Sequence, residues 1–169
     1  MLIVLSGLPG TGKTTLARHL ARRYSGVHLR IDSIEYAISR SGVVAVSLDD
    51  AGYRVAYAVA EDNLWLGRIV VADSVNPIAV TREAWRSVAV RAGVRCVDVE
   101  VICSDPAEHR RRVETRPSDI EGFTLPTWAD VDARDYEPWA GERVIVDTAQ
   151  ASEEESVGVL CAAIDARLR

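Results

Sequence analysis

A glycine-rich pattern near the start of the chain constrains its fold more than any other feature. Residues 7–14 read Gly-Leu-Pro-Gly-Thr-Gly-Lys-Thr and match GxxxxGK[ST] at every fixed position. The apolar residues 2–5 precede the pattern, and residues 15–20 favour a helix directly after it. Glycines let backbone N–H groups converge on phosphate oxygens, and the first turn of a helix adds the positive end of its dipole. The pattern therefore predicts a strand, a phosphate-binding loop and a helix in succession.

The loop residues have distinct expected roles toward ATP. Lys13 should bridge the β- and γ-phosphates as a point charge, and the Thr14 hydroxyl should ligate Mg²⁺. The alternative is a glycine-rich turn without a ligand, which the placement between a strand and a helix disfavours. The residues expected to contact the nucleotide are Gly7, Pro9, Gly10, Thr11, Gly12, Lys13, Thr14 and Thr15.

Five apolar stretches have the length of strands and alternate with helical patterns. They lie at 2–6, 27–31, 68–73, 95–103 and 143–147. Near-continuous apolar strands joined by helices are typical of a parallel sheet covered on both faces, so an α/β fold is expected.

Helix starts and stops are well marked between these stretches. Helices are predicted over 51–67 and 81–92, each ending at a glycine. Asp105 reads as an N-cap with proline at the next position, and Ser152 with Glu155 reads as a capping box before the final helix.

Length and charge limit the classes of protein that fit. With 169 residues, the chain is expected to form a single domain over 1–169. Its 20 Lys and Arg against 25 Asp and Glu give a formal net charge of −5, which disfavours a nucleic-acid partner. Cys96, Cys103 and Cys161 form no CxxC pair, and no signal or membrane segment is visible. We expect a cytoplasmic monomer or homodimer with no membrane partner.

Asp73 is the expected second element of the metal site. Residues 69–72 are apolar and lead into Asp73, and Asn76-Pro77 turns the chain shortly afterwards. Ligands of α/β proteins collect at the carboxyl ends of parallel strands, so a carboxylate here can hold Mg²⁺ through water. The alternative is an aspartate that only starts the turn.

Asp32 is the candidate general base. It follows the stretch 27–31, so it should lie at the same edge of the sheet as the phosphate loop. A carboxylate there can accept the proton of an acceptor hydroxyl and orient that hydroxyl for in-line attack on a phosphoryl group. The alternative is structural, because Asp32-x-x-Glu35 also reads as a capping box. His28 is isolated in the sequence and is expected to be structural.

A basic segment follows the fourth apolar stretch. Arg112 and Arg116 are four residues apart, on one face of the expected helix, and their planar guanidinium groups can stabilise charge on a transferring phosphoryl group. Arg110 is a weaker candidate, for stacking on adenine. The alternative is a solvated basic helix face whose arginines pair with Glu108 and Glu114.

Prolines and glycines interrupt residues 116–141, where one short helix is expected near 127–135. This composition predicts a mobile lid, and an ordinary surface excursion is the alternative. Four aromatic residues of the segment either line an acceptor pocket or belong to the core: Phe123, Trp128, Tyr136 and Trp139.

These motifs resemble those of the P-loop superfamily kinases that include chloramphenicol phosphotransferase, polynucleotide 5′-kinase, gluconate kinase and zeta-toxin kinases. The stretch 31–35, Ile-Asp-Ser-Ile-Glu, is most similar to one in chloramphenicol phosphotransferase. The resemblance implies a three-layer P-loop NTPase sandwich with a parallel five-stranded sheet in the order 2-3-1-4-5 and an arginine-bearing lid. It also places the catalytic aspartate at Asp32 and the RxxxR lid signature at Arg112 and Arg116.

The leading prediction is a kinase that transfers the γ-phosphate of ATP, with Mg²⁺, to a hydroxyl of a small molecule. Polynucleotide kinases usually carry an arginine where Glu35 stands, and an acid facing a phosphodiester would be unfavourable. A nucleotide or polynucleotide 5′-kinase is therefore the second choice. A regulatory ATPase switch is the alternative from another class, and the missing NKxD motif disfavours a GTPase.

Overall fold

The computed structural model of the chain describes residues 1–42 and 50–168. They form an α/β sandwich around a parallel five-stranded sheet in the order β2-β3-β1-β4-β5, the order that the resemblance implies. Every strand lies within a stretch predicted from the sequence. The strands are β1 (Leu2–Ser6), β2 (Val27–Arg30), β3 (Val70–Asp73), β4 (Cys96–Ile102) and β5 (Val144–Asp147).

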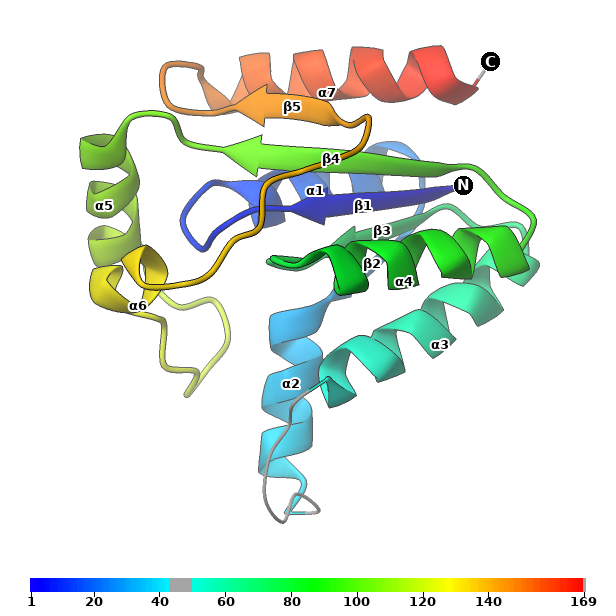
Figure 1. The fold of residues 1–169 in the computed structure, drawn as a ribbon, viewed down its shortest axis with the longest axis horizontal. Coiled ribbons are helices and arrows are strands. Elements are labelled where there is room, and N and C mark those ends of the chain that lie inside the picture. Colours follow the sequence, from blue (N-terminus) through cyan, green and yellow to red (C-terminus); the bar gives the residue numbers. More distant parts are fainter. Residues whose placement is uncertain (43–49, 169) are drawn as a thin grey trace.

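Helices cover both faces of the sheet and its carboxyl edge (Figure 1). The helices are α1 (Lys13–Arg23), α2 (Ile31–Arg40), α3 (Ala51–Trp65), α4 (Ala79–Arg91), α5 (Pro106–Thr115), α6 (Trp128–Asp132) and α7 (Glu153–Leu168). In Figure 1, α5 and α6 lie beyond the arrowheads of β4 and β5, where the strands end. Within the described ranges, no helix is long and apolar enough to cross a membrane.

The sheet separates two apolar cores. On one face, Leu16 and Leu20 of α1 pack with Leu160 of α7 against Ile3 and other strand residues. On the opposite face, α3 and α4 bury their apolar sides, and the largest buried side chain there is Trp85. Burial of this kind contributes about 25 cal/mol per Å² of apolar surface, so the cores hold the strand ends in place.

The strand register brings the candidate site together. Asp73 at the end of β3 pairs with Leu5 of β1 on one side and with Arg30 of β2 on the other. The phosphate loop leaves β1 directly after Ser6, and Asp32 follows Arg30 by two residues. Three parallel strands therefore end at one level, as the pairing of their last residues requires.

Two of the predicted helix starts are confirmed. The Asp105 carboxylate accepts hydrogen bonds from the backbone N–H groups of Ala107 and Glu108, at 2.9 and 3.2 Å. At α7, the Glu155 carboxylate accepts from the Ser152 backbone N–H at 2.8 Å, and the Ser152 hydroxyl accepts from the Glu155 N–H at 3.2 Å. Both satisfy backbone donors that the first turn of a helix leaves open.

The start of α2 differs from the sequence interpretation. The helix begins at Ile31 and its N-cap residue is Arg30, which makes no side-chain capping hydrogen bond within the part of the chain that the structure describes. Asp32 is therefore the second residue of the helix, and the capping-box alternative for Asp32 and Glu35 is wrong. The Asp32 carboxylate still interacts favourably with the positive end of the helix dipole, but it is free to face the site.

The candidate lid, residues 116–141, is fixed at its carboxyl end. Arg82 is buried, and its guanidinium donates to the backbone carbonyls of Glu137 and Pro138, at 2.7 and 3.2 Å. The same group lies 4.2 Å from the ring centroid of Trp139, within the range of a cation–π contact. Residues 117–126, hereafter the lid segment, take no part in these contacts.

Candidate active site

The phosphate loop is held by backbone conformation and by α5. Gly10 and Gly12 have φ angles of +88° and +92°, in the left-handed region that favours glycine. A Cβ atom on Gly10 would lie only 2.6 Å from Cγ2 of Val113. The Nε2 atom of His109 lies 2.8 Å from the carbonyl oxygen of Pro9. Both the conformation and the space require glycine at position 10, and α5 braces the loop.

Lys13 is buried at the start of α1, with 6% of its surface exposed. Burial lowers the pKa of its ammonium group. The charges of Asp73 and Asp32 oppose this shift, whereas those of Arg116 and Arg30 add to it. The ammonium group therefore lies among two carboxylates and two guanidinium groups. The charged side chains of the candidate site come together around it.

Asp73 is a buried carboxylate held by three neighbours. Burial alone raises its pKa, but hydrogen bonds from His28 and Thr14, together with the Lys13 charge, lower it below the usual value. The Nε2 atom of His28 lies 3.2 Å from Oδ2. The other oxygen, Oδ1, is buried without a hydrogen-bond partner among the described residues.

The residues around Asp73 fit a hydrated Mg²⁺ ion. A buried carboxylate oxygen without a partner is costly unless a ligand or a water satisfies it. Mg²⁺ keeps several waters and commonly takes one or two protein oxygens together with phosphate oxygens. Thr14 and Asp73 offer that small set. Over residues 1–42 and 50–168, no group of three or more His, Cys, Asp and Glu side chains could hold a metal alone.

Two pockets meet at Lys13. The first, the loop pocket, has a volume of about 370 Å³ and is lined by the phosphate loop, Arg112 and Asp119. The second, the edge pocket, has a volume of about 630 Å³ and includes Asp32 and Tyr53. The residues that line both are Lys13, Thr14, Arg30, Arg116 and Leu125.

Asp32 faces the edge pocket beside an arginine that the sequence analysis did not single out. The Asp32 side chain is 35% exposed, and its Oδ2 lies 3.5 Å from Nη2 of Arg30. Arg30 ends β2, and its Nε atom is buried without a hydrogen-bond partner among the described residues. A candidate base and an incompletely satisfied cation therefore lie side by side at the junction of the pockets.

Arg116 lies at the same junction. It follows α5 directly and is partly buried, and its Nε atom has no hydrogen-bond partner in the described part of the chain. Burial lowers the pKa of its guanidinium group. The nearby charge of Arg30 adds to this shift, and the charge of Asp32 opposes it. Arg30 and Arg116 thus each have a buried Nε–H group without an acceptor among the described residues. Such a pair favours an anion between the two guanidinium groups, because charged donors bind phosphate oxygens strongly.

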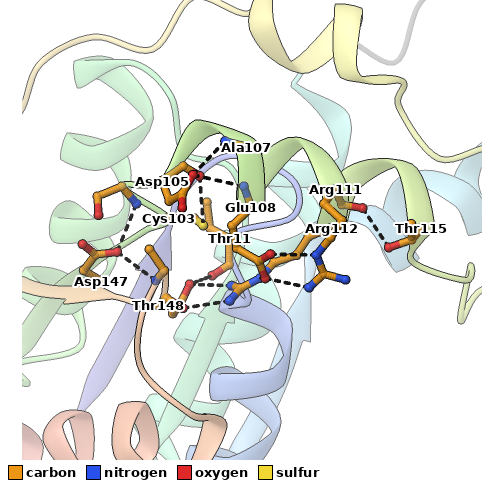
Figure 2. Close-up of polar contacts among 12 residues, drawn as sticks. Thr11, Cys103, Asp105, Ala107, Glu108, Arg111, Arg112, Thr115, Asp147 and Thr148 are labelled. Atoms are coloured by element: carbon orange, nitrogen blue, oxygen red, sulfur yellow. Dashed lines mark hydrogen bonds and ion pairs between the residues drawn. The ribbon is translucent and has the colours of Figure 1, made fainter.

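Arg112 lies between Glu108 and Thr148 (Figure 2). Its Nε donates to Oε1 of Glu108 at 2.7 Å, and Nη1 and Nη2 donate to Oγ1 and the carbonyl oxygen of Thr148, each at 2.8 Å. The Thr148 hydroxyl in turn donates to the carbonyl oxygen of Thr11 at 2.9 Å. Its nitrogens thus tie α5 to the loop after β5. Arg112 and Arg116 both line the loop pocket, but only Arg116 also lines the edge pocket.

A third pocket of about 270 Å³, the side pocket, adjoins the loop pocket through Gly12, Thr15 and Arg112. Arg110 is not among the described residues that line the loop, edge or side pocket. Its Nε donates to Oε1 of Glu114 at 2.8 Å on the exposed surface. The alternative of a solvated basic face therefore describes Arg110 well, and its stacking on adenine stays a prediction.

The four lid aromatics are half-buried, and none of them belongs to either apolar core of the described residues. Phe123 lines the edge pocket. Trp128 packs edge-on against His109, with ring centroids 5.3 Å apart. Tyr136 and Trp139 pack on the Arg82 guanidinium instead.

Four residues of the site were missed from the sequence or given another role. His28 and Arg30 alternate within the second apolar stretch, so they point to the same face of β2, and this period of two could have revealed both. Asp119 and Thr148 carry no comparable local signal, because their partners are far away in sequence.

Comparison with known proteins places the chain among kinases. The family model for the AAA domain matches residues 2–135. A shikimate kinase of Frankia casuarinae is 31% identical over 176 residues, covering 96% of this chain and 72% of that protein. A putative adenylate kinase of Pyrococcus abyssi is 39% identical over 70 residues, and this chain spans only 39% of that relative's length.

A solved structure shares the architecture. The Mycobacterium tuberculosis APS kinase in complex with AMPPNP and APS superposes with a TM-score of 0.72, covering 97% of this chain and 96% of that one. The sequence identity is 19%, so this likeness shows the fold alone.

Proposed function

Because the chain belongs to the AAA domain family of the P-loop kinase superfamily, we propose that it moves the γ-phosphate of ATP to a hydroxyl group of a small molecule. The observation that carries the proposal is the meeting of the loop and edge pockets at Lys13, Thr14, Arg30 and Arg116. A donor phosphate on one side and an acceptor on the other would meet at these cations.

The nucleotide is proposed to extend from the side pocket into the loop pocket. Adenosine in the side pocket would lie against the flat face of Arg112, whose N–H groups are already used by Glu108 and Thr148. The phosphates would lie on the loop amides and Lys13. This arrangement gives Arg112 the adenine role that was predicted for Arg110.

Arg116 is the arginine proposed to stabilise charge on the phosphoryl group during its transfer. Its open Nε–H group and its position in both pockets support this role. Mg²⁺ held by Thr14 and, through water, by Asp73 would neutralise charge on the phosphates. The remaining catalysis rests on positioning and on charge stabilisation, with no covalent intermediate.

Asp32 is proposed to receive the proton of the acceptor hydroxyl. It lines the edge pocket but not the loop pocket, which is the position that an acceptor base needs. Glu35 lies one turn further along α2 in the same pocket, and burial raises its pKa. This acid supports a neutral or cationic acceptor in preference to a nucleic-acid end.

The relatives support a small acceptor. Shikimate kinase is named for a small-molecule substrate, and the match covers 96% of this chain. The partial match to a putative adenylate kinase favours a nucleotide as the second candidate acceptor. A regulatory ATPase switch would need no residues arranged as an acceptor site.

A panel of hydroxyl compounds tests the proposal. The purified protein would be incubated with ATP and Mg²⁺ and, separately, with shikimate, gluconate, chloramphenicol, nucleoside monophosphates, amino sugars and a 5′-hydroxyl oligonucleotide. We expect ADP release that depends on one small compound, with the phosphorylated product seen by mass spectrometry. If ADP is released at the same rate with every hydroxyl compound and without one, the result would instead support the regulatory ATPase switch.

A further inference from the structure

Arg30 joins the lid segment to the first turn of α2. Its Nη1 donates to Oδ1 and Oδ2 of Asp119 at 2.9 and 2.8 Å. Its Nη2 lies 3.5 Å from Oδ2 of Asp32. Only 11% of the Arg30 side chain is exposed, so these charges interact in a partly desolvated place, where they are stronger than at the surface.

Asp119 fastens the lid segment to two elements of the core. Besides Arg30 of β2, Arg18 of α1 donates to the same carboxylate. Burial raises the pKa of the Asp119 carboxyl, but the hydrogen bonds from Arg30 and Arg18 outweigh burial and hold the pKa below its usual value. The contact therefore depends on an ionised Asp119, and opening the lid segment would leave both arginines without this partner.

The planar shape of the Arg30 guanidinium group links its contact with Asp119 to its contact with Asp32. An arginine side chain presents its donors in a planar, rigid fork, so fixing Nη1 also fixes the direction of Nη2. With Nη1 held on Asp119, Nη2 faces Asp32. Without Asp119, the fork is free to rotate about the side-chain torsions, and Asp32 loses its oriented neighbour.

We infer that Arg30 is a positioning residue that couples closure of the lid segment to the orientation of the Asp32 carboxylate. The inference rests on the proposed function, because orienting Asp32 matters only if this carboxylate receives the acceptor proton. Binding of an acceptor that closes the lid segment would orient Asp32, the carboxylate that receives the acceptor's proton. An open site would hold a poorly oriented base, which limits loss of the phosphoryl group to water.

Thermodynamic coupling is reciprocal, and this gives a test that needs no acceptor. Amide hydrogen exchange would be measured for residues 118–126 and for 34–37 of α2, in the free protein and with AMPPNP and Mg²⁺. Asp32→Asn should speed exchange in the lid segment about threefold, although Asp32 lies outside it. Asp119→Asn should speed exchange in the first turns of α2 by about the same factor.

The deciding variant is Arg30→Lys, which keeps the charge but cannot span both carboxylates. In that background, Asp32→Asn should leave exchange of the lid segment unchanged. Arg30→Gln gives the same comparison if the lysine variant is unstable. Glu121→Gln, an exposed acid of the same segment, is the matched control and should alter neither region.

The inference is overturned if Asp32→Asn leaves lid exchange unchanged in the parent protein, or changes it equally in the Arg30→Lys background. The proposed function fails by a different result. If AMPPNP with Mg²⁺ protects no amides of the phosphate loop, the nucleotide site is wrong, while the coupling can still be decided from the free protein.

Discussion

The Nε2 atom of His28 lies 3.2 Å from Oδ2 of Asp73 and joins β2 to the candidate metal site. The Asp73 carboxyl has a pKa below its usual value, so it is ionised and can only accept hydrogen bonds. The imidazole is therefore the donor. This contact uses Oδ2, and Oδ1 has no hydrogen-bond partner among the described residues, so His28 would hold Asp73 in an orientation that leaves Oδ1 to a hydrated Mg²⁺ ion.

Replacing His28 should weaken the metal-dependent part of nucleotide binding. In His28→Leu, Asp73 loses the partner that orients it. Replacing such a partner of a metal ligand typically lowers metal affinity by about tenfold or more. We expect the Kd of ATP with Mg²⁺ to rise by about that factor, with ATP affinity in EDTA unchanged. Calorimetric titration in both conditions measures the difference.

His19→Leu is the matched control for loss of an imidazole, because His19 is not among the described residues that line the loop, edge or side pocket. Its partner Glu153 lines the side pocket, so any change in ATP affinity should be the same with Mg²⁺ and in EDTA. Equal losses with and without Mg²⁺ in His28→Leu would mean that His28 only supports the fold.

Thr148→Val should loosen the contact between α5 and the phosphate loop. Valine has nearly the same shape but lacks the hydroxyl that donates to Thr11 and accepts from Arg112. Polar groups left unsatisfied in a buried place cost about 1–3 kcal/mol, so both stability and ATP affinity should fall. Urea denaturation and nucleotide titration would measure these losses. Unchanged values for both would remove Thr148 from the nucleotide site.

Lys13→Ala and Thr14→Ala test the phosphate loop itself. The first removes the buried ammonium group and the second removes a metal ligand, so each should strongly reduce ATP turnover. The fold of Lys13→Ala should survive, because burying this cation is itself unfavourable, as its lowered pKa indicates. Turnover and melting temperature would be measured together. Undiminished turnover in both variants would contradict the nucleotide assignment.

The lid segment should become more protected when a nucleotide binds. Residues 118–126 contain no helix or strand, whereas residues 137–139 are held by Arg82. We expect slower amide exchange for 118–126 with AMPPNP and Mg²⁺, and no change for 137–139. Equally slow exchange of 118–126 in both states would mean that the segment is an ordinary surface loop.

Much of the fold could be predicted because its determinants are local. The apolar stretches and the loop pattern define five strands and their crossovers, and the short signals at Asp105 and Ser152 mark helix starts. Asp32 shows where local reasoning fails. The same residues fit both a capping box and a base site, and the structure shows that α2 begins one residue before Asp32, with Arg30 as its N-cap.

The arginines could not be assigned from spacing alone. Arg112 and Arg116 share a helical spacing, but α5 ends at Thr115, so Arg116 leaves the helix and turns toward Lys13. Arg112 stays on the helix and meets Thr148, which is 36 residues further along the chain. Contacts at that distance depend on the packing of the whole domain. The cytoplasmic location and the oligomeric state stay predictions.

The most direct test of the account is phosphoryl transfer by Asp32→Asn to the acceptor found in the panel. Asparagine keeps the size and the fold but cannot accept the proton, so transfer should fall by about 10² or more, with ATP affinity and melting temperature close to those of the parent protein. Acceptor-dependent formation of the phosphorylated product is the readout. An Asp32→Asn protein that transfers at the parent rate would contradict the assignment of Asp32 as the base at the junction of the two pockets.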